Sequence, residues 1–227
     1  MTTVIPAATP DPTRAEVVGR VEDSFRDVYL TLVSIIQGVA LGYLVQVIGP
    51  DYRSLGVDHG ARGAAIVAFI VAVWQEYMVG ATTQAWIPGV LDSLAPFLIG
   101  VGEFLMISAL SASISDYLFF AICAWAAGLL AEMNYFRHAR AARSPASRDS
   151  KAVIGVHSRT GPVLGAGGVA FAVLLWVWSL DPATPAALLA ALSILPGVAA
   201  IASAQTRWTR PMRGRVRCER RRSCVGY

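Results

Sequence analysis

The feature that most limits the fold of this chain is a series of six long apolar runs, none of which contains Lys or Arg. Each run can cross about 30 Å of hydrocarbon as an α-helix, the second only just. The chain is 55% hydrophobic, with 15% charged residues against about 25% in a soluble domain. These properties predict an all-α, polytopic integral membrane protein with six transmembrane helices. The expected spans are Val28–Gly49, Gly63–Gly80, Val90–Leu110, Ile114–Phe136, Pro162–Leu180 and Ala183–Ala204.

The positions of the 19 basic residues predict the orientation of these spans. Seventeen lie in the N-terminal tail, in the link between the fourth and fifth spans, and in the C-terminal tail, whereas only Arg53 and Arg62 remain for the opposite side. With six spans the three basic segments fall on one side, so the positive-inside rule places both termini in the cytoplasm. Aromatic residues near the span ends fit interfacial belts: Tyr29, Tyr52, Trp74, Tyr77, Trp86, Tyr117, Tyr135, Trp176 and Trp178.

The chain divides into a cytoplasmic tail (1–27), a transmembrane domain (28–205) with a basic cytoplasmic loop (137–161), and an Arg-rich cytoplasmic tail (206–227). We expect the lipid bilayer to be the main partner, with anionic lipids attracted to the basic loop and tail. No aromatic stacking platform accompanies these charges, so we expect no nucleic-acid partner. Arg makes up eighteen of the 19 basic residues and Ala is abundant, which suggests a GC-rich bacterial genome and an inner-membrane location.

Glu103 is the residue that points most strongly to a function. It lies near the middle of the third run, and an ionisable group at bilayer depth is costly and commonly functional. Asp92, eleven residues earlier, projects from the same helix face, and Pro96 and Gly100 share that stripe. Such a stripe is what a hydrated cation or proton path requires, because irregular backbone at depth must face protein or water.

The candidate ion or proton pathway therefore consists of Glu103 and Asp92, with Gln37 and Glu76 as further polar groups. A structural interpretation stands beside it. Glu103 can be a protonated acid that is hydrogen-bonded within the bundle, and Gln37, near the centre of the first span, is its natural partner. The carboxylates toward the cytoplasmic ends, Asp92, Glu76 and Glu132, can pair with Arg26, Arg137 or Arg140.

Glycines mark sites of close helix packing. Gly38 and Gly42 form a GxxxG pattern in the first span, which favours either packing within the bundle or dimerisation into a homo-oligomer. Gly100 lies on the Glu103 stripe of the third span. In the sixth span, Pro196 and Gly197 predict a kink.

The remaining reactive residues form no known catalytic or metal-binding pattern. Cys218 and Cys224 have a C-x5-C spacing that matches no zinc or redox signature, and the three histidines lie outside the spans. We therefore expect no enzymatic activity, no catalytic residue, no metal site and no cofactor.

Two functional hypotheses follow. In the first, the protein is a channel or small transporter for a cation or a proton-coupled solute, with the first and third helices lining a path through Glu103. In the second, it is a non-transporting sensor, anchor or assembly subunit whose intramembrane polar residues serve helix packing.

Overall fold

The computed structural model describes residues 14–83, 89–141 and 148–206. These residues form helices and turns, and no strand occurs in any of the three ranges. The principal helices are α1 (Arg14–Ile48), α2 (Val57–Thr83), α3 (Val90–Ser108), α4 (Ile114–Ala141), α5 (Arg148–Trp178) and α6 (Ala186–Leu192). Short 3-10 turns follow α1 (η1, Gly49–Asp51) and α3 (η2, Ala109–Ser111).

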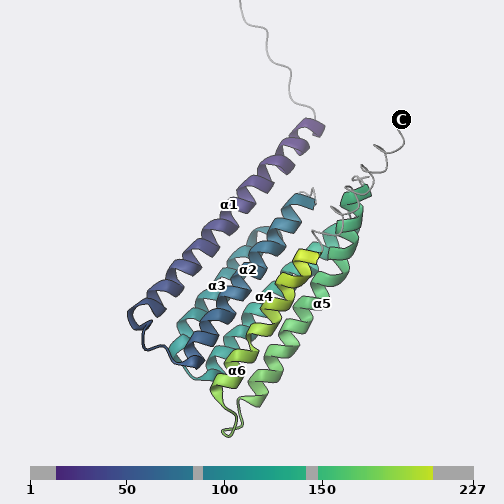
Figure 1. Cartoon of the computed structure of the whole chain (residues 1–227). Coiled ribbons are helices and arrows are strands. Elements are labelled where there is room, and N and C mark those ends of the chain that lie inside the picture. The colour runs from purple at the N-terminus through teal and green to yellow at the C-terminus, as the bar shows by residue number, and fades with distance from the viewer. Residues whose placement is uncertain (1–13, 84–88, 142–147, 207–227) are drawn as a thin grey trace, which may run out of the picture.

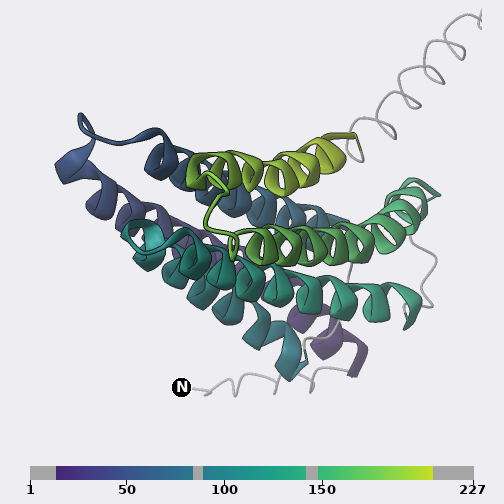
Figure 2. The ribbon, with the colours of Figure 1, turned by 90° about the horizontal axis from the view of Figure 1, so that it is seen from below.

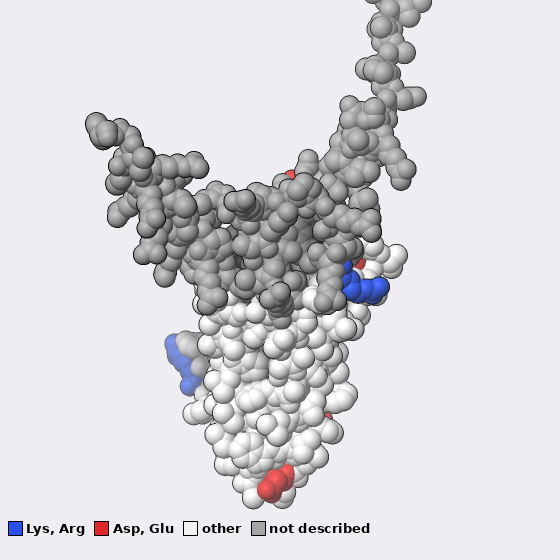
Figure 3. Space-filling model, turned by 90° about the vertical axis from the view of Figure 1, so that its right-hand side faces the viewer, with Lys and Arg blue, Asp and Glu red and all other residues white. Residues whose placement is uncertain are grey.

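Six stretches of these helices are long and apolar enough to cross a membrane, as the sequence predicts. They are Asp27–Ile48, Val57–Gly80, Val90–Ser111, Ile114–Arg137, Thr160–Trp178 and Ala186–Thr206. Successive helices alternate in direction, so the outer ends of α1 and of the last helix lie at the same end of the bundle (Figure 1). Between the two ends, the face in Figure 3 is almost free of charged side chains, as a surface in contact with lipid should be.

The helices pack in a simple order. α4 lies between α3 and α5, α6 packs along α2, and α1 packs on α2 and α3 (Figure 2). Small residues permit the closest approaches. A Cβ added to Gly102 of α3 would lie 2.9 Å from Ala124 Cα on α4, and a Cβ on Gly197 would lie 2.8 Å from Ala68 Cβ on α2. Helices in a membrane gain their association energy from such contacts, because lipid offers little hydrophobic driving force.

Two predictions about helix shape have different outcomes. The kink expected near Pro196 is present: the helical path breaks at Ser193 and resumes over residues 194–206. Pro196 has no N–H to donate to the carbonyl four residues earlier, and this accounts for the break. The basic loop 137–161 is mostly helix instead, because α4 continues to Ala141 and α5 begins at Arg148.

Gly38 and Gly42 do not pack within this bundle. Both glycines are exposed, and no atom lies within 4 Å of where a Cβ would stand on either. The interpretation of their GxxxG pattern as packing within the chain is therefore wrong, and dimerisation remains a prediction. Gly100 does mark a close contact as predicted, because its added Cβ would lie 2.7 Å from Ile36 Cγ2 of α1.

Arg62 fastens α2 to the turn between α3 and α4. Its side chain is 3% exposed and forms an ion pair with Asp58, one turn earlier on α2. The guanidinium also donates to the carbonyls of Leu110 (3.1 Å) and Ala112 (2.7 Å). These carbonyls lie in and directly after η2, the turn that follows α3, so Arg62 acts as a cap that a neighbouring helix supplies.

Candidate functional site

Glu103 lies in the interior of the bundle on α3. Its side chain is 0% exposed, and the stripe of Asp92, Pro96, Gly100 and Glu103 is buried throughout. The sequence thus predicts correctly that these residues share one face, and that face points inward. Neither carboxyl oxygen of Glu103 has a hydrogen-bond partner among the described residues. A buried carboxyl group without a donor is rare, because desolvation of the group then goes uncompensated.

Gln37 is the polar side chain that α1 brings toward Glu103. It is 6% exposed and lies close enough to the Glu103 carboxyl to interact with it, but the Glu103 oxygens do not form the hydrogen bond that the sequence suggests. The geometry falls short of a hydrogen bond, and the Gln37 Oε1 also has no partner within the part of the chain that the structure describes. The two side chains are therefore neighbours, and the Gln37 Oε1 and both Glu103 oxygens accept no hydrogen bond from the described residues.

Tyr77 extends the polar region toward the end of the bundle that carries the termini. Its side chain is 6% exposed, its hydroxyl finds no hydrogen-bond partner in the described ranges, and its ring packs edge-on against Tyr29 at 5.4 Å. It lies within electrostatic range of both Glu103 and Glu132. Tyr29, Tyr77 and Tyr117 are buried within the bundle, whereas Tyr52, Trp74 and Trp178 are exposed. Exposure does not report membrane depth, so the interfacial belts stay a prediction.

Asp92 has a structural explanation. Its Oδ2 accepts from the Gly89 N–H (2.7 Å), which caps the start of α3, and its Oδ1 accepts from Asn134 Nδ2 of α4 (2.6 Å). The first bond stays within the start of α3, and the second joins α3 to α4. Of the basic partners that the sequence suggests for the interfacial carboxylates, the side chains of Arg26 and Arg140 lie outside the described residues.

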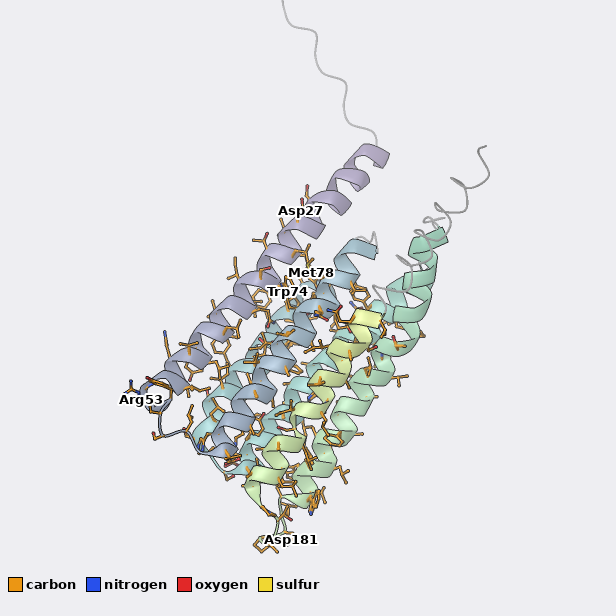
Figure 4. The ribbon with its side chains drawn as sticks, viewed as in Figure 1. Asp27, Arg53, Trp74, Met78 and Asp181 are labelled. Carbon is orange, nitrogen blue, oxygen red and sulfur yellow. The ribbon has the colours of Figure 1, made fainter. Side chains whose placement is uncertain are left out.

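Glu76 lines a cavity of about 60 Å³ near the end of the bundle that carries the termini. Figure 4 marks this half of the bundle by the labels on Trp74 and Met78 of α2, which flank Glu76 in the sequence, whereas Arg53 and Asp181 mark the opposite end. The cavity wall also includes Tyr77, Glu132, Tyr135 and Ile99. Ile99 precedes Glu103 by one helical turn on α3, so the cavity reaches to within one turn of the buried carboxyl.

The bundle is closed on the other side of Glu103. Met106, Ile107 and Leu110 follow it on α3 and the turn after it, and each is at most 2% exposed. The polar region therefore covers only one half of the membrane depth in this arrangement. The described residues contain no group of three or more His, Cys, Asp or Glu side chains that could hold a metal ion.

Asn134 and Arg62 have structural roles that the sequence pattern did not predict. Asn134 lies inside the fourth apolar run, and an amide at depth needs a partner just as a carboxyl group does. For Arg62 the signal was the i, i+4 spacing from Asp58, which pairs the two on one helix face.

These observations define a multi-pass helical membrane protein with a buried carboxyl group at mid-depth and a cavity that approaches it from one end. No protein-family model, curated protein or solved structure matches the chain. Any function assigned to it must therefore come from its own residues.

Proposed function

We propose that the protein is a small proton-coupled transporter in which Glu103 is the group that binds and releases the proton. The observation that carries this proposal is the state of the Glu103 carboxyl, which is fully buried at mid-depth with no hydrogen-bond partner among the described residues. A carboxylate held there permanently would bear its full desolvation cost. A carboxyl group that binds and releases a proton as its exposure changes does not need a fixed hydrogen-bond partner in the buried state.

A proton suits this site better than a metal cation. Glu103 and Gln37 together offer three oxygen atoms, whereas a calcium ion takes about six to eight and a magnesium ion about six. A single carboxyl beside one amide is sufficient to hold a proton. The remaining polar groups, at the wall of the cavity, provide a route to it from the end that carries the termini.

The closed half of the bundle requires a conformational change for transport. Ile107 and Leu110 block the route beyond Glu103, so access must alternate between the two sides. α3 has a weak point for such a change: Pro96 lies inside the helix and leaves the carbonyl four residues earlier without its helical donor. Proline-interrupted helices at the binding site are common in secondary transporters.

We also infer that the end carrying the termini faces the cytoplasm of a bacterial inner membrane. The excess of arginine in the tails and in the link between α4 and α5 supports this orientation. The cavity then opens from the cytoplasmic half, and Arg62 lies toward the opposite face.

The second candidate is a non-transporting membrane subunit whose polar residues fasten helices. One observation favours it: Asp92, Asn134 and Arg62 are all engaged in bonds between helices or at helix ends. Glu103 does not fit this pattern, because it joins no other group by a hydrogen bond within the described part of the chain.

Proton flux into proteoliposomes separates the two candidates. The protein is reconstituted with a pH-sensitive dye inside, and flux is followed under imposed pH, sodium and potassium gradients and with a panel of solutes. We expect flux in the wild type, loss of flux in Glu103→Gln, and normal flux in Asp116→Asn, whose carboxyl is exposed at the other end. Absence of wild-type flux under every gradient rejects transport. Normal flux in Glu103→Gln rejects the assignment of the site.

A further inference from the structure

The cavity near the termini has the composition of a binding site. Most of its wall is apolar or aromatic and includes Phe69 and Trp125, which pack edge-on at 5.1 Å. Two carboxylates, Glu76 and Glu132, enter this wall from α2 and α4, and the described residues that line it include no Lys, Arg or His. At roughly 10–15 Å³ for each water-sized group, about 60 Å³ holds about four to six such groups.

A second observation points to a ligand. Tyr77 lines this cavity and is buried, and its hydroxyl, which lies close enough to Tyr29 to interact with it, makes no hydrogen bond of good geometry among the described residues. A buried hydroxyl left without a partner costs about 1–3 kcal/mol. A ligand that donates to or accepts from it would remove that cost.

An apolar groove adjoins the cavity. It measures about 260 Å³, lies between α5 and the last helix, and shares Leu164 with the cavity wall. Val163 and Leu195 line the groove and are 69% and 52% exposed, so the groove faces the bilayer. Gly167 lines the groove on the α5 side and leaves open space where a Cβ would stand.

We propose that the cavity binds the compact ammonium head of an amphiphilic amine, whose apolar tail lies in the groove between α5 and the last helix. The carboxylates attract the cation, and Trp125, Phe69 and Tyr77 place aromatic rings in the same wall, where cation–π attraction can add to it. An anionic head would be repelled by the same carboxylates. A hydrated metal ion would lose water to a wall that offers few oxygen ligands in return.

The binding site follows from the cavity and the groove alone. The further step, that the amine is the transported solute, rests on the proposed function. Tyr77 lies within electrostatic range of both Glu132 and Glu103, which provides a physical connection between cation binding and protonation at mid-depth.

Equilibrium dialysis of radiolabelled hexylamine against nanodiscs tests the binding site. The nanodiscs contain phosphatidylglycerol, and binding to empty nanodiscs is subtracted. We expect saturable binding of hexylamine, with hexanol and hexanoate failing to compete. Equal competition by hexanol overturns the cationic specificity, and absence of saturable binding overturns the site.

Three variants locate the binding. Glu132→Gln and Glu76→Gln should each weaken it about tenfold, because each removes one charge from a weakly solvated wall. Gly128→Val should also weaken it, since Gly128 lines the cavity and has open space where a Cβ would stand. Asp116→Asn serves as the control and should bind as the wild type does. Unchanged binding in all three variants overturns the proposed location, even if one variant folds poorly.

A second lipid mixture identifies the source of the amine. The ammonium head of phosphatidylethanolamine shares the chemistry of a free amine, and adding this lipid to the nanodiscs displaces hexylamine if the lipid is the occupant. Undiminished binding identifies a free amine instead. If hexylamine binds but no flux occurs in proteoliposomes, the transport proposal is rejected and the binding site stands. If proton flux occurs but hexylamine does not bind, the binding site is rejected and the transport proposal stands.

Discussion

Replacement of Arg62 by methionine should destabilise the bundle more than any other change of a charged residue outside the pathway. The side chain is 3% exposed and makes four hydrogen bonds, two to the Asp58 carboxylate and two to backbone carbonyls. Methionine fills a similar volume and forms none of them. The turn between α3 and α4 would then lose its connection to α2.

The size of the effect follows from the burial of each acceptor. The bond to the Leu110 carbonyl is buried, and leaving that oxygen without a donor costs about 1–3 kcal/mol. The Asp58 side chain is 23% exposed and the Ala112 bond is part-buried, so water replaces part of these bonds and each loss adds at most about 1 kcal/mol. The expected total is about 3 kcal/mol, near the lower end for a broken buried pair.

Unfolding in mixed micelles, with SDS as the denaturant and far-ultraviolet circular dichroism as the readout, measures this cost. Arg53→Met is the matched control, because the Arg53 side chain contacts the neighbouring Tyr52 ring, and it should change stability by at most about 0.5 kcal/mol. The double variant Asp58→Ala/Arg62→Met should cost less than the sum of the two single variants. A cost below about 1 kcal/mol for Arg62→Met, or strict additivity, would refute this reasoning.

Three further outcomes are expected. Gly102→Val should lower the free energy of unfolding by about 1–3 kcal/mol in the same titration, because its Cβ would meet the α4 backbone. Gly42→Ile should change the stability of the monomer by at most about 0.5 kcal/mol, because its Cβ meets no atom. Equal effects of the two variants would contradict this packing. Asn134→Ala should cost about 1–2 kcal/mol, since Asp92 loses its 2.6 Å bond to α4, and a neutral result would show that this bond adds nothing. A cysteine at Ser54, in the exposed turn after α1, should react with an impermeant maleimide in intact cells; labelling only after lysis would reverse the orientation.

The sequence was sufficient to predict the spans because hydropathy and helix length are local properties. The starts of the third and fourth spans coincide with those of α3 and α4, and the break in the last helix follows from the missing N–H of Pro196. Which helices pack together was not predictable, since that depends on contacts between distant residues. Gly42 and Gly102 illustrate this point: both are glycines in apolar runs, yet only Gly102 lies against another helix.

The candidate site was predictable only in part. The cost of a carboxyl at depth identified Glu103, and helical spacing placed Asp92 on its face. The same rule did not separate their roles, because Asp92 is engaged by Gly89 and by Asn134, which is 42 residues away, whereas Glu103 has no such partner among the described residues. The cavity was invisible in the sequence, since its wall combines residues from several helices.

The bonds of Arg62 also impose an order on membrane insertion. Asp58 lies four residues before Arg62, so this pair can form as soon as α2 is helical. The two carbonyls lie 48 and 50 residues farther along the chain. When only α1 and α2 have been synthesised, the Arg62 guanidinium therefore has the two bonds to Asp58 and lacks the two to the backbone carbonyls. We therefore expect the Val57 end of α2 to reach its final depth only after the α3–α4 hairpin has entered the membrane, so that these three helices insert as a unit.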